Sequence, residues 1–437
     1  MEHSVSRQGM NARYDVAYAV GAGIVGYSYL VQVGEFLFQS PASYYSQSRR
    51  WEVAPGYEGE RVLDFDHPIL SGCVFCHAGL ARLKAGSQNR FERDALTAIS
   101  CERCHGPVEE HLRSPQKGSI VNPAKLGGAS RDSVCEQCHL EGAARVLNPG
   151  KQWWDFRVGE AAERTFVTYV RKRERRDIPA VSQSEQLAES RCARESGGKL
   201  WCGSCHDPHG SAVAVTGVCL SCHAELFAAK RHAPAKECTS CHMPQLPATN
   251  VAHASVTDHR IPRPGGRVAE GAAGKGEIVP WRAGPSAVAE RDLGLALYAD
   301  GWKHRDVDQL QRAYSLLKGK AAAIHGDAEV EAALGALLIG IRAAKSALEV
   351  LEVAVKLNPA NAELHYLLGS ALADTGKLGE AVRELEWSIQ LDPSMAEGYR
   401  RLGVVYGELG NEAERQRVVE RYLKFMPQST RFRAGDR

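Results

Sequence analysis

Six copies of the pattern Cys-x-x-Cys-His lie in one stretch of the chain, and they restrict its possible folds more than any other feature. The copies end at His77, His105, His139, His206, His223 and His242. With 16 histidines among 437 residues, six coincidences are expected on the order of once in 10⁸ trials or less. The pattern is the signature of c-type haem attachment, in which two thiols bind one porphyrin and the histidine binds its iron.

We therefore expect six haem c groups, each held by two thioether bonds and one proximal histidine. The attachment residues are Cys73, Cys76, Cys101, Cys104, Cys135, Cys138, Cys202, Cys205, Cys219, Cys222, Cys238 and Cys241. The motifs ending at His206, His223 and His242 follow one another closely, so the last three haems should lie near one another. Long periodic helices are few between the motifs, and the macrocycles should replace most of the usual apolar core.

Two other uses of paired cysteines are open. Pairs of CxxC can form tetrathiolate zinc centres, or the cysteines can form disulfide bonds. The histidine that follows every pair favours haem over both. The total of 13 cysteines is odd and leaves Cys192 outside the motifs. A buried thiol is the simpler interpretation of Cys192, and a redox or ligand role is the alternative.

The iron ligands opposite the motif histidines come from a short inventory. After the first residue, only Met10 and Met243 are methionines within 1–262, and Met243 adjoins a proximal ligand, so methionine is at most a minor ligand. Six histidines outside the motifs are candidates: His67, His111, His209, His232, His253 and His259. We expect most of them to bind the iron of a neighbouring motif. A hydrogen bond to a haem propionate is the alternative role for each.

The chain divides into four parts, with a fold that is mainly α. Residues 1–70 read as a small β-rich segment, with strands near 15–20, Gly26–Val33 and 35–38 and a tight turn at Gly34. Residues 71–262 are the loop-rich hexahaem cytochrome c domain, and 263–285 are a Pro- and Gly-rich linker. The apolar run 16–33 could also be a signal core or a membrane span, but its glycines, tyrosines and Gln32 favour strands.

Residues 286–437 have the period of a tetratricopeptide α-solenoid. Pro359, Pro393 and Pro427 are 34 residues apart, and Leu-Gly pairs keep the same phase. The clearest unit is 360–393, and 287–320 is a degenerate first one. Such helix pairs usually bind protein, with a structural cap or oligomer spacer as the alternative. No further amphipathic helix follows residue 425, so we expect an open end on the last repeat, where self-association could occur.

Composition is that of an ordinary soluble protein. The hydrophobic share of 44% and the charged share of 24% are typical. The formal net charge of +2 gives no indication of a nucleic-acid partner. A basic run at 171–176 is either a solvated face or a docking patch for an acidic redox partner.

The motif segments together resemble a known family. They are CERCHGPVEEH at 101–111, VNPAKL at 121–126, CEQCHLEG at 135–142, CGSCHDPHG at 202–210, CTSCHMP at 238–244 and TDHRI at 257–261. They resemble the bacterial multihaem c-type cytochromes with doubled CxxCH motifs that are fused to tetratricopeptide repeats. The resemblance implies an extracytoplasmic, haem-carrying electron-transfer protein in which His111 and His209 are distal ligands. The match at His67 is poorer.

Members of that family commonly begin with an export signal and a further haem motif, and neither follows Met1 in this sequence. Since c-type haem is attached to exported chains, we expect a periplasmic or extracellular protein. We also expect the gene product to extend upstream of Met1.

The sequence favours an electron-transfer protein over a catalyst. In this interpretation six haems pass electrons in series, redox partner proteins dock on the repeats, and a membrane-associated respiratory complex is one setting. The alternative is an oxidoreductase that acts on nitrite or hydroxylamine at a five-coordinate haem. Multihaem nitrite reductases usually carry CxxCK on the catalytic haem, whereas all six motifs here end in His. A third interpretation is a scaffold whose haems sense redox state or a gas.

Overall fold

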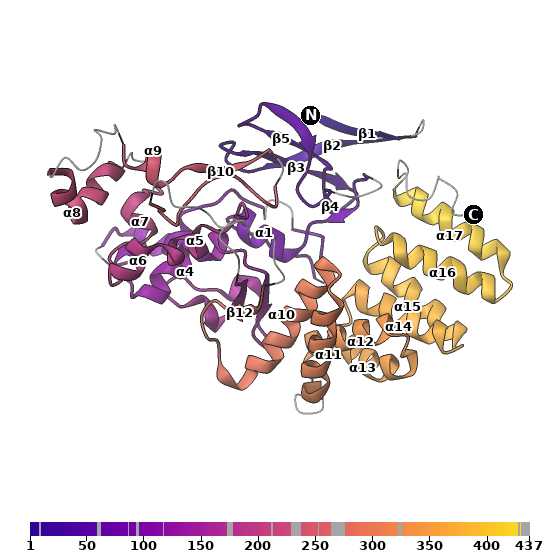
Figure 1. The fold of residues 1–437 in the computed structure, drawn as a ribbon. Helices are drawn as coiled ribbons and strands as arrows, with labels where there is room; N and C mark the ends of the chain where they lie inside the picture. The colour runs from indigo at the N-terminus through magenta and orange to yellow at the C-terminus, as the bar shows by residue number, and fades with distance from the viewer. Residues whose placement is uncertain are drawn as a thin grey trace. The chain divides into compact units, whose positions relative to one another are not determined.

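The structure is a computed structural model that describes residues 1–7, 10–58, 63–85, 87–92, 96–116, 118–172, 178–210, 213–228, 237–251, 253–263, 276–321, 326–426 and 429. The chain forms two compact units. Unit 1 comprises Met1–Ala98 and Pro285–Arg437, and unit 2 comprises Ile99–Gly284. In Figure 1 the N-terminal strands of unit 1 are indigo, and its C-terminal helices are orange to yellow.

Unit 1 begins with a seven-stranded antiparallel sheet. Its strands are β1 Glu2–Arg7, β2 Met10–Val20, β3 Gly26–Val33, β4 Phe36–Gln39, β5 Ala42–Tyr45, β6 Arg50–Val53 and β7 His67–Pro68. The main order is β1-β2-β3-β4-β7, while β5 pairs with β3 and β6. The predicted strands are confirmed, and Gly34 at the turn between β3 and β4 has a φ of +59°, which glycine adopts without strain. In the part of the chain that is described, no helix is long and apolar enough to cross a membrane.

Unit 1 ends with four helix pairs. They are α10 Ala289–His304 with α11 Val307–Ala321, α12 Ala328–Gly340 with α13 Ala344–Leu357, α14 Ala362–Asp374 with α15 Leu378–Leu391, and α16 Ala396–Glu408 with α17 Glu412–Phe425. The helices α12, α14 and α16 begin at residues 328, 362 and 396, a step of 34 residues. The helices α13, α15 and α17 begin at 344, 378 and 412, the same step. The predicted helical repeat is confirmed and is compatible with a tetratricopeptide arrangement.

Glycines allow the two helices of a pair to approach closely. A Cβ on Gly369 would lie 2.7 Å from Cγ of Leu385, and a Cβ on Gly335 would lie 2.3 Å from Cδ2 of Leu351. Both leucines are fully buried. Because a close-packed interior leaves no room for an added methyl group, Gly335 and Gly369 mark close contacts between paired helices, whereas Gly403 of the third Leu-Gly pair has no atom within 4 Å of an added Cβ.

The N-terminal sheet packs against the last repeat. Phe36 meets Phe425 edge to face, with ring centres 5.5 Å apart. Oγ of Ser429 donates to Oδ2 of Asp64 at 2.9 Å, and both residues are fully buried, as is Tyr422 of α17. The open end expected from the sequence is therefore wrong, because apolar residues of the sheet cover it. Self-association through another surface stays a prediction.

Unit 2 consists of short helices and two small sheets. Its helices are α2 Glu102–His105, α3 Glu109–Arg113, η1 Pro123–Lys125, α4 Gly128–His139, η2 Trp153–Asp155, η3 Ala162–Arg164, α5 Gln183–Glu189, α6 Arg191–Glu195, α7 Cys202–Cys205, α8 Val215–Ala228 and α9 Thr239–His242. Strands β8 Ala144–Leu147, β9 Phe166–Arg171 and β12 Ile278–Pro280 form one sheet, and β10 Gln245–Pro247 and β11 Ser255–Thr257 form the other. The apolar core of unit 2 centres on β9, where Phe166, Val167 and Tyr169 are buried.

The two units differ from the predicted division of the chain in two places. The first motif lies on α1 Ser71–His77 and belongs to unit 1, whereas the other five motifs belong to unit 2. The predicted linker 263–285 contains β12, which pairs with β9 because Ile278 is apolar and buried. Residues 264–275 of that linker, and 173–176 of the basic run, lie outside the described residues.

Candidate functional site

Each Cys-x-x-Cys-His motif lies on or beside a short helix. The motif ending at His77 lies in α1, and those ending at His105, His139, His206, His223 and His242 lie in or at the end of α2, α4, α7, α8 and α9. Residues three and four positions apart share a face of a helix. The two cysteines and the histidine of a motif are therefore directed to one side, as attachment to a single porphyrin requires.

The third motif is held by residues distant in sequence. Arg282 donates to both carboxylate oxygens of Glu136, at 2.7 and 2.8 Å, and Nε1 of Trp281 donates to the same carboxylate at 3.0 Å. Burial raises the pKa of Glu136, and the bond with Arg282 opposes that shift. Arg145 donates to the carbonyl of Gln137 at 2.8 Å, near the end of α4, where carbonyls lack helical partners. These contacts orient the helix that carries Cys135, Cys138 and His139.

Cysteines of the second, third and fourth motifs lie together. Cys135 is hydrogen-bonded to Cys202, and this bond and burial raise the pKa of Cys135. Cys104 is close enough to act on the same thiol. Three motifs that are separated by long segments of sequence therefore meet in space.

Cysteines of the last three motifs are also grouped. Burial raises the pKa of Cys219 to about 11, and the neighbouring Cys238 adds to the shift. Cys205 acts on the same thiol. This grouping is what the short spacings between these motifs lead us to expect.

His105 of the second motif faces His209, which lies outside the motifs. Their ring centres are 5.8 Å apart, and their planes are inclined by 23°. Two imidazoles that bind one metal from opposite sides have ring centres about 6 Å apart, because each metal–nitrogen bond is about 2 Å long. The pair therefore has the separation of a proximal and a distal ligand, and the two histidines come from different motif segments.

His206 of the fourth motif faces His259 in a similar way. Their ring centres are 6.1 Å apart, and their planes are inclined by 27°. Burial lowers the pKa of His259, and the neighbouring His206 and His139 lower it further. The neutral imidazole is the form that binds a metal.

Five candidate ligands share a hydrogen bond at Nδ1. The pairs are His105 with the carbonyl of Val121 at 2.7 Å, His111 with Oγ of Ser119 at 2.7 Å, His209 with Oδ1 of Asp207 at 3.0 Å, His242 with the carbonyl of Pro262 at 3.0 Å, and His259 with the carbonyl of Thr257 at 2.8 Å. Metal-binding histidines commonly donate the proton of one ring nitrogen in this way, which orients the ring and directs the other nitrogen to the metal.

A histidine of the repeats has hydrogen bonds at both ring nitrogens. His365 is buried, with Nδ1 at 2.7 Å from Oε2 of Glu384 and Nε2 at 3.0 Å from the carbonyl of Pro359. Because protein groups engage both of its nitrogens, His365 serves packing. Hydrogen bonds at Nδ1 are also present at His3 and His304 of unit 1, so such a bond is compatible with metal binding but does not by itself identify a ligand.

The structure gives other observations for two of the remaining predicted distal ligands. His67 stacks on Tyr57 with ring centres 3.8 Å apart, which is a packing contact. His253 is exposed and has a left-handed φ of +57°. His232 lies outside the described residues. The structure thus brings His209 and His259, among the six predicted distal ligands, opposite a motif histidine.

The groups that orient the imidazoles were not predicted from the sequence. Asp207 and Thr257 lie two residues before His209 and His259, inside the motif segments, so their closeness was a usable signal. Val121 and Pro262 act through backbone carbonyls, which every residue possesses. No residue type could have marked those two positions.

The donor set fits haem c by its chemistry. Haem iron can take two ligands from the protein, and each pair of facing imidazoles could supply them. Among the described residues, which include all 13 cysteines, no disulfide bond joins two of them. In the same residues, no group of three or more His, Cys, Asp or Glu side chains is arranged to hold a metal ion.

Comparison with known proteins finds similarity only to solved structures, and each covers about a third of this chain. No family model matches it, and no curated protein matches it. A structure described as the crystal structure of MamA protein is 27% identical, covering 31% of this chain and 74% of the other, with a TM-score of 0.28. A MamA fragment from Desulfovibrio magneticus RS-1 is 23% identical, covering 33% and 81%, with a TM-score of 0.29. Scores this low do not bear on the fold or function of this chain.

Proposed function

We propose that this protein is an extracytoplasmic multihaem c-type cytochrome, which transfers electrons through six covalently bound haem c groups and docks redox partner proteins on its repeats. The observation that supports this most directly is the facing of His105 with His209 at 5.8 Å and of His206 with His259 at 6.1 Å. Each pair joins a motif histidine to a histidine that the sequence had singled out as a distal ligand.

The residues of the chain would hold and orient the groups. The motif cysteines would provide the thioether sulfurs, and the paired imidazoles would bind the iron. Asp207 and the carbonyl of Thr257 hold the distal rings, while Glu136 and Arg282 hold α4. When bound, haem c supplies one-electron transfer at its iron.

The incomplete burial of apolar residues on α8 also supports the proposal. This helix carries the fifth motif and is apolar, yet Val215, Val218 and Leu220 are only half-buried. Covering apolar surface stabilises a fold by about 25 cal/mol per Å². A porphyrin attached at Cys219 and Cys222 is a partner of suitable size and polarity for this surface.

Electron paramagnetic resonance of the haem-loaded full chain tests the ligand pairs. We expect low-spin ferric signals from the intact protein. Substituting His209→Ala or His259→Ala should convert one haem each to a high-spin signal, because the iron loses one axial nitrogen. His304→Ala is the matched control, since His304 lies in the repeats and is bonded to the carbonyl of Asp300.

Two results would count against the proposal. Unchanged low-spin signals in both variants would show that the facing pairs do not bind iron. A high-spin signal in the intact protein that responds to nitrite or hydroxylamine would instead favour the oxidoreductase alternative.

A further inference from the structure

Two thiols from different motifs are hydrogen-bonded in unit 2. Cys135, on α4, donates its S–H to Sγ of Cys202, the first residue of α7. The two cysteines belong to the third and fourth motifs and are far apart in the sequence. Both are half-buried, so a small oxidant in solution can reach them.

Arg131 holds together the segments that carry the two thiols. Its Nη1 donates to the carbonyl of Gly198 at 3.1 Å. Its guanidinium lies over the ring of Trp201, with Cζ 4.8 Å from the ring centre, and Trp201 directly precedes Cys202. Arg131 lies four positions before Cys135 on α4, and residues at this spacing share a face of a helix. The face of α4 that contacts Trp201 therefore also carries the thiol of Cys135.

The two cysteines within one motif are less suited to each other. Cys135 and Cys138 both lie within α4, where β-carbons three positions apart are separated by about 5–6 Å. A disulfide bond requires β-carbons about 3.5–4.5 Å apart. Joining Cys135 to Cys138 would therefore unwind the end of α4. Cys202 lies on a different segment, and a bond to it leaves α4 intact.

We propose that Cys135 and Cys202 form a reversible disulfide bond in the haem-free chain, which makes the contact between α4 and α7 a redox-sensitive site. The bond itself does not depend on the proposed function. Its consequence for haem does, because neither motif could then hold a porphyrin by two thioether bonds. One disulfide bond would block two haems at once.

The hydrogen bond between the thiols decides which of them reacts first. The S–H of Cys135 stabilises the thiolate of Cys202 and so lowers the pKa of Cys202. This thiolate attacks one sulfur of a small disulfide such as oxidised glutathione, forming a mixed disulfide and releasing one glutathione thiolate. Cys135 then loses its proton and attacks Sγ of Cys202, which releases the second glutathione. Two protein thiols are oxidised, and one glutathione disulfide is reduced to two thiols, which take up the two protons.

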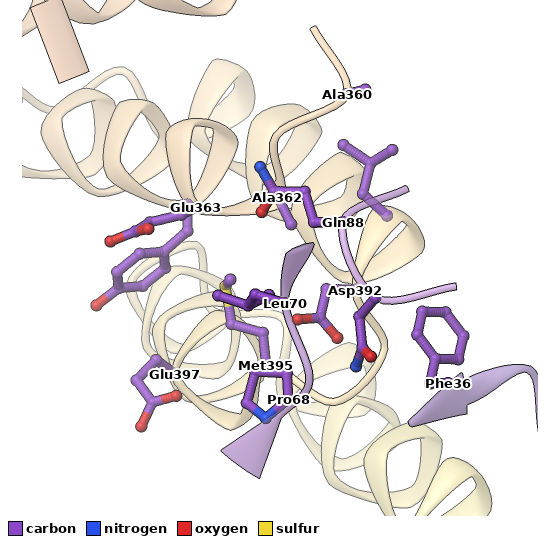
Figure 2. Close-up of a pocket in the computed structure, with 13 residues that line it drawn as sticks. Phe36, Pro68, Leu70, Gln88, Ala360, Ala362, Glu363, Asp392, Met395 and Glu397 are labelled. Atoms are coloured by element: carbon purple, nitrogen blue, oxygen red, sulfur yellow. The ribbon is translucent and has the colours of Figure 1, made fainter. Parts of the chain in front are cut away.

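Unit 1 has no counterpart of this pair. Its two cysteines, Cys73 and Cys76, belong to one motif on α1. The cavity of about 230 Å³ in unit 1, shown in Figure 2, is lined by carboxylates such as Glu363 and Asp392, and none of its described lining residues is a cysteine. A disulfide bond between two motifs of the same unit can therefore form only in unit 2.

Peptide mapping by mass spectrometry of the haem-free full chain tests the proposal. The chain is equilibrated with reduced and oxidised glutathione, and the remaining thiols are blocked. We expect Cys135–Cys202 to be the most abundant disulfide that involves either cysteine. Arg131→Ala should lower its yield roughly fivefold, because the contacts between the two segments are lost. Arg191→Ala is the matched control, since Arg191 is exposed and bonded to Glu195 of its own helix, and circular dichroism verifies that both variants keep their helices.

Haem uptake by the same samples tests the consequence. After incubation with reduced haem, the chain that carries the Cys135–Cys202 bond should hold two haems fewer than the reduced chain, measured as the mass of the intact protein. Treatment with dithiothreitol should remove the difference. A chain that takes up no haem in either state would contradict the proposed function alone, because the disulfide bond is mapped without haem.

Three outcomes would overturn the proposal. Disulfide bonds only within motifs, such as Cys135 with Cys138, would show that the motif helices unwind rather than meet. A bond of Cys135 to Cys104, which also acts on its thiol, would assign a different partner. An unchanged yield of Cys135–Cys202 in urea would show that the fold does not select the pair, since an unfolded chain favours cysteines close in sequence.

Discussion

The helices of the repeats and the helices that carry the motifs in unit 2 are stabilised in different ways. The repeat helices have 13 to 16 residues each and bury regularly spaced residues such as Leu351 and Leu385 against their neighbours. The motif helices α2, α7 and α9 have four residues each. Isolated helices this short do not persist in water, because nucleation costs more than so few hydrogen bonds return. The comparison teaches that the motif helices need support from outside the backbone.

Part of that support is visible in the structure. The hydrogen bonds between Glu136 and Arg282 hold α4. The helices α7, α8 and α9 belong neither to the sheet around β9 nor to these bonds. In the repeats, amino-acid side chains alone form the core. Under the proposed function, covalently attached macrocycles would do the same for the last three motifs.

The largest expected effect comes from withholding haem. The full chain, expressed without haem attachment, should lose protection from amide hydrogen exchange in α7, α8 and α9 by on the order of 100-fold. Protection in α12 to α17 should stay close to that of the haem-loaded protein, because their core is made of side chains. Hydrogen exchange with mass spectrometry measures both regions in one sample. Equal protection of the motif helices with and without haem would remove the contrast between the two regions.

A smaller effect is expected from glycines in the repeats. Gly369→Ala should lower the free energy of unfolding of the repeats by about 1–3 kcal/mol, because the new methyl group overlaps Leu385. Gly403→Ala is the matched control, since no atom lies within 4 Å of its added Cβ. The Gly403→Ala variant should raise the free energy of unfolding of the repeats by about 0.5–1 kcal/mol, because alanine has a higher helix propensity than glycine. Urea unfolding followed by circular dichroism measures both shifts, and two shifts of the same sign would contradict the close packing.

The smallest effect concerns His3 in β1. This residue is buried, with Nδ1 at 2.7 Å from Oγ of Ser40, and burial lowers its pKa from the ordinary value of 6.5. The unfolded chain therefore takes up a proton at higher pH than the folded one. Unit 1 should lose stability as the pH falls below about 6.5, and the loss should level off below the lowered pKa.

Urea midpoints of unit 1 recorded against pH measure this effect. His3→Asn should flatten the dependence below pH 6.5, while His304→Asn, at a half-exposed position with a side chain 53% exposed, should not. If the urea midpoint of the His3→Asn variant still falls below pH 6.5, the titrating group is a residue other than His3.

Local pattern predicted much of the fold. The strands β3 and β4 follow from apolar residues on both sides of the turn at Gly34, and the helix pairs follow from the spacing of Pro359, Pro393 and Pro427. Both signals arise from neighbours in the chain. The contact of Phe36 with Phe425 joins residues at opposite ends of the sequence, and no local signal contains it.

The candidate site likewise has residues that local spacing could predict and pairings that it could not. The attachment cysteines and the motif histidines could be named from spacing, because thioether and iron bonds at one porphyrin require residues a few positions apart. Which distal histidine belongs to which motif could not be named. His209 lies three residues after His206, but it faces His105.

The sequence by itself determined the six local motifs on which the proposed haem attachment rests, and the period of the helical repeat. Only the tertiary structure decided that the first motif joins the repeats rather than the other five, that the sheet covers the last repeat, and that His259 faces His206. The physical reason is that spacing along the chain dictates bonds to one cofactor and contacts within one helix pair. Contacts between distant segments depend on the path of the whole chain and on the apolar surface that each segment must bury.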